Sequence, residues 1–221
     1  MFLKNQFFII ISEDLDMKHF LFKNKYWTVT LSLFSVMILS LLVFSCQSIK
    51  GPSAEISREL LGTPVMSEQG LFDYFMSKKP DADRSMVKRL AHYYVTEGKI
   101  EGINSDVAFA QMCLETGYLS FGNLVVPEMH NYCGLGAMDA AHPGEYFESE
   151  QIGVRAHIQH LQAYATTQDV PLKQKLVDPR YGWVHKVKFA KDIYDLAGVW
   201  ATDKAYGEKI DAILSKMEMF R

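Results

Sequence analysis

The chain lacks an excess of positive charge, since 23 Lys and Arg residues stand against 26 Asp and Glu, for a formal net charge of -3. Nucleic-acid binding needs a basic surface, so this balance argues against such a partner. The sequence also has no internal repeat, no low-complexity tract and few segments in which apolar and polar residues alternate. These absences favour one folded domain that contains little β-sheet.

An apolar run covers residues 26–45 and ends at Cys46. Three lysines precede the run, as in a secretory signal. The closing residues Leu-Val-Phe-Ser-Cys resemble a bacterial lipobox, in which the cysteine is acylated and becomes the N-terminus after cleavage. The alternative is an uncleaved membrane anchor, for which a run of this length suffices. We expect residues 1–45 to be a signal peptide and Cys46 to carry a lipid.

The segment before Met17 contains acidic residues where a signal peptide should be positive, so Met17 is the better start of the signal. Residues 46–63 include Gly51 and Pro52 and are expected to form a tether. One monomeric domain, residues 64–221, should follow. The lipid would hold it in the bacterial cell envelope, on the outer membrane or on a membrane that faces the periplasm.

Helical patterns dominate the domain. The expected helices are Ser67–Lys78, Asp83–Glu97 with Gly98 as its stop, Val107–Thr116 capped by Asn104, Gln151–Thr166, Phe189–Ala197 and Lys204–Phe220. Residues 121–147 are rich in Gly, Pro, Asn and His and predict loops with at most a small hairpin, and Asp178–Tyr181 predicts a turn. The fold class is therefore mainly α, and α+β at most.

Glu115 is the first candidate for chemistry because it follows the apolar residues Met112, Cys113 and Leu114 at the end of a helix. The partial negative charge of a helix C-terminus and low-dielectric surroundings both disfavour an ionised carboxylate there. Both effects raise the pKa, as a general acid requires if it is to be protonated near neutral pH. The alternative is a surface glutamate at a frayed helix end.

Three motifs in order resemble the glucosaminidase domain of glycoside hydrolase family 73. They are Ala-Gln with Glu-Thr-Gly at residues 110–111 and 115–117, Asn-Tyr-Cys-Gly-Leu-Gly-Ala at 131–137, and Trp-Ala-Thr-Asp-Lys-Ala-Tyr-Gly-Glu-Lys-Ile at 200–210. The resemblance spans about residues 103–214. It implies a lysozyme-like helical domain with a short loop or hairpin lobe beside the groove, an endo-β-N-acetylglucosaminidase activity on the glycan strands of peptidoglycan, and no cofactor or metal.

By that resemblance Glu115 is the general acid and Tyr206 lines the site beside the reacting sugar. Residues expected to bind substrate are Gln111, Tyr118, Asn131, Tyr132 and Gly134. Asn131 and Tyr132 would shape the floor of the groove, and Gly134 and Gly136 would let the backbone approach the sugar closely.

The second carboxylate is open. Glycosidases usually pair two acids, and the lobe after residue 137 offers Asp139, Glu145, Glu148 and Glu150. Glu145 precedes the aromatic pair Tyr146-Phe147 and is the preferred candidate. Alternatively the N-acetyl oxygen of the substrate acts as nucleophile, and no second carboxylate is needed.

Cys113 and Cys133 are the cysteines left after Cys46. Cys113 lies about 200° around the helix from Glu115 and should face the core, so two buried thiols are expected, with a disulfide as the alternative. His157 and His160 share a helix face, but no acidic ligand completes a known zinc motif. Packing of that face against neighbouring helices is the preferred interpretation.

Two other functions compete with hydrolysis. A lytic transglycosylase also uses one Glu in a lysozyme-like fold but forms a 1,6-anhydro product, and the 131–137 and 200–210 motifs favour the hydrolase over it. The other competitor is a lipoprotein that binds peptidoglycan without cleaving it.

Overall fold

The structure is a computed structural model that describes residues 55–167 and 169–221. The predicted signal peptide and Cys46, the predicted site of the lipid, lie outside these described residues. In the described part, regular structure consists of α2 (Glu68–Lys78), α3 (Arg84–Glu101), α4 (Ser105–Glu115), η1 (Pro127–Met129), α5 (Glu150–Ala165), α6 (Tyr181–Val187), α7 (Tyr206–Met217) and η2 (Glu218–Phe220). The mainly α class is confirmed. None of these helices is long and apolar enough to cross a membrane.

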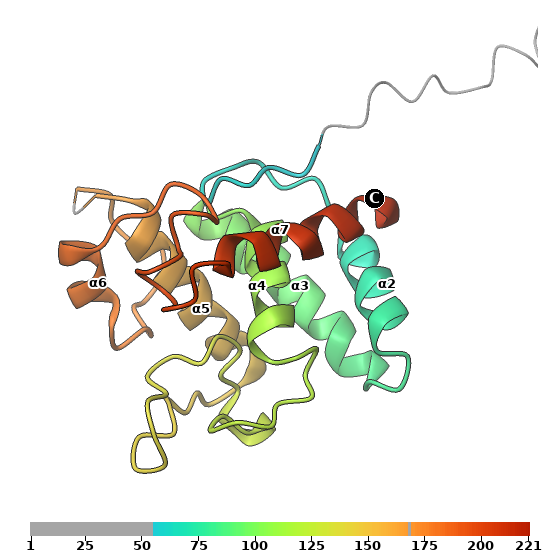
Figure 1. Ribbon diagram of the computed structural model, residues 1–221, viewed down its shortest axis with the longest axis horizontal. Helices are drawn as coiled ribbons and strands as arrows, with labels where there is room; N and C mark the ends of the chain where they lie inside the picture. The colour runs from blue at the N-terminus through green and yellow to red at the C-terminus, as the bar shows by residue number, and fades with distance from the viewer. Residues whose placement is uncertain (1–54, 168) are drawn as a thin grey trace, which may run out of the picture. The chain divides into compact units, whose positions relative to one another are not determined.

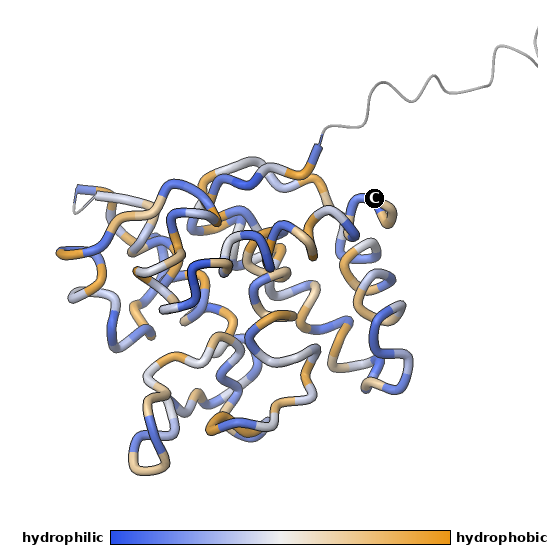
Figure 2. The backbone as a smooth tube through the Cα atoms, in the orientation of Figure 1, coloured by the Kyte–Doolittle hydropathy of each residue, from blue (hydrophilic) through white to orange (hydrophobic). Residues whose placement is uncertain are grey.

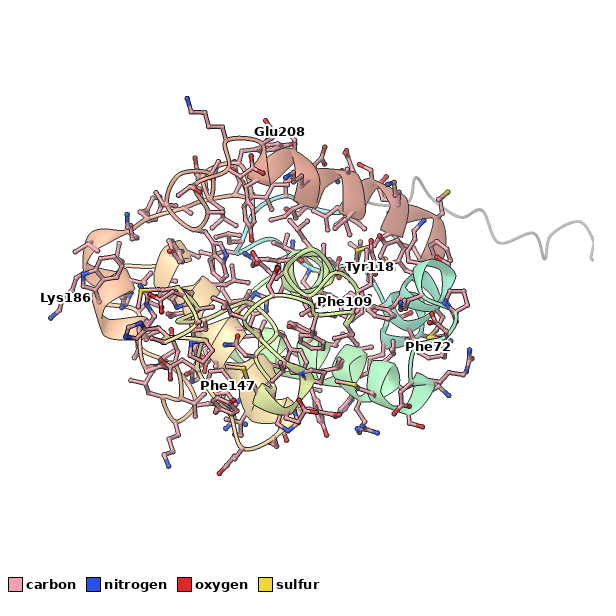
Figure 3. The ribbon with its side chains drawn as sticks, turned by 60° about the horizontal axis from the view of Figure 1, so that its bottom comes forward. Phe72, Phe109, Tyr118, Phe147, Lys186 and Glu208 are labelled. Atoms are coloured by element: carbon pink, nitrogen blue, oxygen red, sulfur yellow. The ribbon has the colours of Figure 1, made fainter. Side chains whose placement is uncertain are left out.

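Helix α4 forms the centre of the domain, and α2, α3, α5 and α7 pack against it (Figure 1). Every residue from Ser105 to Cys113 is buried. In Figure 3, Phe109 of α4 lies in the middle of the domain, whereas Lys186 and Glu208 lie at its edges. Hydrophobic and hydrophilic residues alternate along the outer helices (Figure 2), as expected of helices that cover such a core.

The predicted caps of α2 and α4 are confirmed. The Ser67 side chain accepts a hydrogen bond from the Gly70 N–H, and the Asn104 side chain accepts one from the Asp106 N–H. The predicted stop of α3 at Gly98 is wrong, because the helix continues to Glu101 and ends at Gly102, whose φ is 80°. Gly98 serves another purpose: a Cβ there would lie 2.9 Å from the Ile103 carbonyl oxygen, so glycine lets the chain fold back closely into α4.

The predicted helix at Phe189–Ala197 is also wrong. Asp192 accepts hydrogen bonds from the N–H groups of Tyr194 and Asp195, which replaces helical hydrogen bonds with a local turn. The same segment pairs with the chain near Glu59 through an isolated antiparallel bridge at Asp192. The nearby helix is instead α6, which begins at Tyr181, where a turn was predicted.

The packed domain begins before the expected boundary at residue 64. Ile56 and Leu60 are fully buried, and the Arg58 guanidinium contacts Asp211 at 2.7 Å and Glu218 at 3.0 Å. Residues 56–63, expected to belong to the tether, are therefore part of the folded domain.

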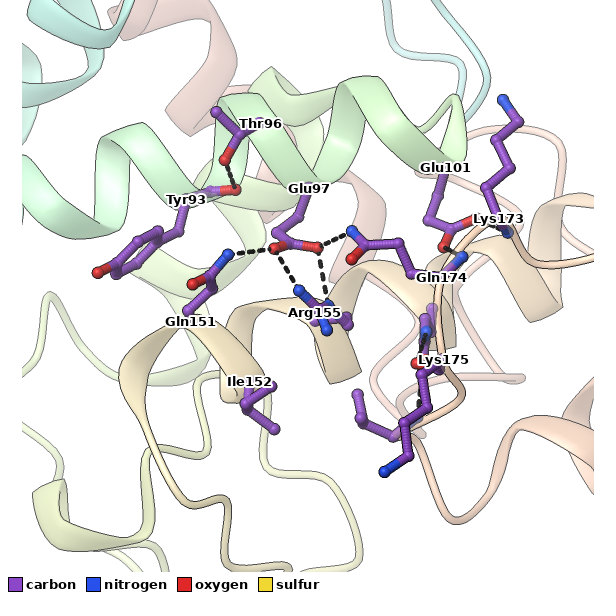
Figure 4. Close-up of polar contacts among 12 residues, drawn as sticks. Tyr93, Thr96, Glu97, Glu101, Gln151, Ile152, Arg155, Lys173, Gln174 and Lys175 are labelled. Atoms are coloured by element: carbon purple, nitrogen blue, oxygen red, sulfur yellow. Dashed lines mark hydrogen bonds and ion pairs between the residues drawn. The ribbon is translucent and has the colours of Figure 1, made fainter.

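A buried carboxylate joins α3 to α5. Glu97 is 1% exposed and accepts hydrogen bonds from Arg155 Nε and Nη2, from Gln151 Nε2 and from Gln174 Nε2 (Figure 4). Because the guanidinium binds both carboxylate oxygens, the buried charge is compensated. Glu97 thus has a structural role.

Gly153 of α5 gives a test of the packing around the loop that follows η1. A Cβ at Gly153 would lie 1.8 Å from the His130 carbonyl oxygen, so the backbones would have to separate. We expect Gly153→Ala to lower the free energy of unfolding by about 1–3 kcal/mol or more. The control is Gly182→Ala in α6, where no atom lies within 4 Å of the new Cβ and a gain of about 0.5 kcal/mol is expected. Urea unfolding measures both, and equal effects would contradict the packing.

Candidate active site

Glu115 is the last residue of α4 and faces a cavity of about 450 Å³. The cavity lies between the end of α4, the segment 121–125, the loop 131–137 and Trp200. Among the described residues that line it, Glu115 carries the only carboxylate. The helix therefore places one acid at the wall of a cleft, and the alternative of a frayed surface glutamate does not describe this geometry.

Burial raises the pKa of Glu115 above its ordinary value of 4.5, and hydrogen bonds from Tyr206 and Trp200 oppose the rise. The Tyr206 hydroxyl and the Trp200 indole N–H, the latter at 3.1 Å, both donate to Oε1 of Glu115. Oε1 is therefore saturated with donors. The remaining oxygen, Oε2, lies near Gly134, at 3.9 Å from where a Cβ of that glycine would stand.

A chain of buried hydrogen bonds leads from Tyr206 into the core. Gln111 Nε2 donates to the Tyr206 hydroxyl over 2.8 Å, and Gln111 Oε1 is 3.0 Å from His157 Nε2. An amide oxygen can only accept, so His157 carries its proton on Nε2 and accepts at Nδ1 from the Tyr94 hydroxyl, 2.9 Å away. Burial lowers the pKa of His157 to about 3, which keeps the ring neutral. Every donor in this chain thus points toward Glu115.

The motif around Tyr206 has a structural basis at the start of α7. Asp203 accepts a hydrogen bond from the Ala205 N–H and contacts Lys209 Nζ at 2.5 Å. The bond with Lys209 lowers the pKa of Asp203. Together these contacts fix the turn that places Tyr206 at the first position of the helix.

The loop 131–137 is held by the side chain of Asn131. Its Oδ1 accepts from the Leu135 N–H at 2.9 Å, and its Nδ2 donates to the carbonyl oxygens of Leu135 and Glu145. Gly134 and Gly136 adopt φ values of 68° and 76°, which favour glycine. Asn131, Gly134 and Glu115 border the same cavity.

Three residues expected to touch substrate do not border the cavity. Gln111 and Tyr132 are completely buried, so the structure gives Gln111 a role in holding Tyr206 and gives Tyr132 a role in the core. Tyr118 packs against Phe75, and its hydroxyl bonds to that of Tyr74. The Tyr206 hydroxyl is also engaged within the protein, since it binds Glu115 and Gln111, and Tyr206 is only 5% exposed.

Glu145 borders a second cavity together with Gly136 and Arg180. Its carboxylate lies against Gly136, with Oε1 3.1 Å from the position of a Cβ there. Among the other acids of the lobe, Asp139 bonds to His142 and Glu150 to Arg89. None of these side chains borders the cavity of Glu115.

Cys113 and Cys133 are buried free thiols, as preferred, and burial raises the pKa of both. His157 and His160 are buried in the core, and His160 Nδ1 is 2.8 Å from Asp178 Oδ2. Packing of this helix face against its neighbours is therefore confirmed.

The sequence did not single out Trp200 or the role of His157. Trp200 is the first residue of the third motif, which was the available signal, but its bond to Glu115 joins residues 85 positions apart. Nothing in the local pattern of α5 distinguishes a histidine that orients Gln111 from one that only fills the core.

Comparisons with known proteins show the family of the chain. A family model described as "Glucosaminidase: Mannosyl-glycoprotein endo-beta-N-acetylglucosaminidase" matches residues 91–219. A protein of Borreliella burgdorferi, described only as an uncharacterized protein, is 39% identical over 170 residues, which cover 75% of this chain and 82% of that protein. No solved structure gave a match. Since the family model covers more than half of the chain, including Glu115, the loop 131–137 and Tyr206, the chain belongs to the glucosaminidase family, glycoside hydrolase family 73.

Proposed function

We propose that the protein is an endo-β-N-acetylglucosaminidase that cleaves the glycan strands of peptidoglycan after N-acetylglucosamine, with Glu115 as general acid. The observation that carries this proposal is the Glu115 carboxyl at the wall of a cleft, with a pKa raised by burial. A glycosidic oxygen leaves readily only when it is protonated, and a carboxyl that keeps its proton near neutral pH supplies that proton.

The hydrogen bonds select which oxygen carries the proton. Oε1 accepts from both Tyr206 and Trp200, so a proton there would face two donors. The proton therefore resides on Oε2, next to Gly134. A strand bound along the loop 131–137 would place its glycosidic oxygen at Oε2, where transfer of the proton breaks the bond to the leaving sugar.

The second catalytic group follows from what borders the cleft. Glu115 is the one carboxylate among its described lining residues, and Glu145 lies beyond the loop 131–137 in the neighbouring cavity. This arrangement favours attack by the N-acetyl oxygen of the substrate on the anomeric carbon. Water would then open the cyclic intermediate, with Glu115 as base. The alternative second carboxylate is Glu145, which requires that the lobe carrying it moves when substrate binds.

We also propose that the domain works from a membrane of the bacterial cell envelope, through a lipid on Cys46. The support is the lipobox-like sequence before Cys46. Mass spectrometry of the purified wild type and of the Cys46→Ser variant tests this anchor. The wild type should carry the added mass of the lipid, and the variant should not.

The reaction is tested by digesting purified sacculi with the full chain and analysing the fragments by mass spectrometry. Reducing-end N-acetylglucosamine is the expected product. Fragments that end in 1,6-anhydro-muramic acid would make the protein a lytic transglycosylase instead. Binding to sacculi without release of any fragment would leave it a non-catalytic wall-binding protein.

A further inference from the structure

A third cavity adjoins the cleft of Glu115 at Trp200. It measures about 240 Å³ and shares Gly134, Ala137 and Trp200 with the cleft. Its outer wall is made by Arg180, Trp183 and Lys188, which come from α6 and its two ends. Because the same indole borders both cavities, a strand bound at Glu115 that continues past Trp200 brings its next sugar to this wall.

Two cations converge on one aromatic ring at this wall. The Arg180 guanidinium and the Lys188 ammonium each lie 5.9 Å from the ring centroid of Trp183. Trp183 is 55% exposed, although it is a large apolar side chain. An exposed ring in a cavity can stack on a sugar face, and cations held against it are oriented rather than free.

These cations have no acidic partner in residues 55–167 and 169–221. No carboxylate lies within ion-pair distance of Arg180 or Lys188 there. Asp178 is the acid closest to Arg180 in sequence, but it is buried and already accepts from the Arg180 backbone N–H and bonds to His160. Glu145 borders the adjoining cavity without forming an ion pair. Two cations that border one cavity and lack an acidic partner in the described residues favour an anionic ligand there.

We propose that Arg180, Lys188 and Trp183 form a subsite that binds a carboxylate-bearing sugar next to the bond that Glu115 cleaves. The proposal rests on the proposed function. Arginine recognises carboxylates through two parallel hydrogen bonds, and the lysine adds a second charge. In peptidoglycan the muramic acid units carry carboxylates in two places, the peptide stem and, where no stem is attached, the lactyl ether. Chitin strands carry neither, so the subsite distinguishes wall glycan from neutral glycan.

The test compares three substrates: strands with peptide stems, the same strands after an amidase has removed the stems, and neutral N-acetylglucosamine tetramer. Arg180→Gln with Lys188→Gln should lower kcat/KM on stem-bearing strands by about tenfold, the loss expected when hydrogen bonds to a charged group are removed. The activity on the neutral tetramer should not change. The matched control is Lys186→Gln, which removes a charge from the same helix at a side chain that points outward from α6 (Figure 3).

The substrates identify the source of the anion. A loss confined to stem-bearing strands assigns the subsite to the stem carboxylate. A loss confined to stripped strands assigns it to the lactyl carboxylate, and a loss on both means that the subsite accepts either carboxylate. An equal loss on the neutral tetramer, or no loss on either charged substrate, would overturn the proposal. The selective effect should also shrink as salt is raised from 50 to 500 mM, because the charges are partly exposed.

Binding separates this proposal from the proposed function. Calorimetry with the full chain carrying Glu115→Gln measures affinity for a soluble stem-bearing tetrasaccharide and for the neutral tetramer without cleavage. The chain is measured with and without the double substitution of Arg180 and Lys188. If the wild type cleaves none of the substrates, the proposed function fails, yet the double variant must still lose affinity for the stem-bearing ligand alone. If the double substitution changes the affinity for neither ligand, the subsite is refuted whether or not the wild type is active.

Discussion

Replacement of Glu115 by Gln should lower kcat on purified sacculi by about 10³-fold, because it removes the proton donor and leaves the rest of the cleft in place. Glutamine suits the site. Its carbonyl oxygen can accept the hydrogen bonds from Tyr206 and Trp200 that Oε1 accepts in the wild type. Its amide takes the position of Oε2 beside Gly134, where it cannot protonate a leaving group. Release of soluble fragments, followed against time, measures the loss.

The stability of the same variant provides a control with a defined sign. The pKa of Glu115 is raised in the folded state, so its protonation stabilises the fold at low pH, and that stability is lost as pH rises through the raised pKa. Glutamine is neutral throughout. The difference in Tm between Glu115→Gln and wild type should therefore grow in favour of the variant from pH 4 to pH 8. Wild-type activity in a variant that folds normally would eliminate Glu115 as the acid.

The sequence could predict the place of Glu115 at the end of an apolar helix because the signals for it are local. An apolar helix that ends at Glu115 and a glycine just beyond it are visible in a short stretch of chain. The partnership with Tyr206, 91 positions away, came from the motif resemblance, since periodicity alone cannot pair two helices. The same holds for Asn131, whose side chain closes the loop 131–137 on itself.

The residues that the sequence missed act over long distances or against local propensity. Ile56 and Leu60 are apolar and four positions apart, but only the packed domain shows that both side chains are buried. The segment 189–197 has helical composition, yet the turn at Asp192 and its bridge to Glu59 hold it in another conformation. Tertiary contacts decide such segments, and no window of sequence contains both partners.

Tyr206→Phe should lower kcat by between about 10-fold and 100-fold, the loss expected for a hydrogen bond to a charged group in a buried site. The Tyr206 hydroxyl donates to Oε1 of Glu115 and so holds the carboxyl in place with Oε2 toward the cleft. That bond also lowers the pKa of Glu115. Without it the pKa rises further, so the alkaline limb of the kcat profile should move to higher pH even as the maximum rate falls.

The matched control is Tyr94→Phe, which removes a buried hydroxyl from the other end of the same hydrogen-bonded chain. Its loss leaves His157 Nδ1 without its donor, so the free energy of unfolding should fall by about 1–3 kcal/mol, as in Tyr206→Phe. Glu115 keeps both of its own donors, however, and the pH profile should stay where it is. A structural role for Tyr206 alone would make the two variants equivalent. If the alkaline limb moves in Tyr206→Phe and not in Tyr94→Phe, the Tyr206 hydroxyl acts on Glu115 itself.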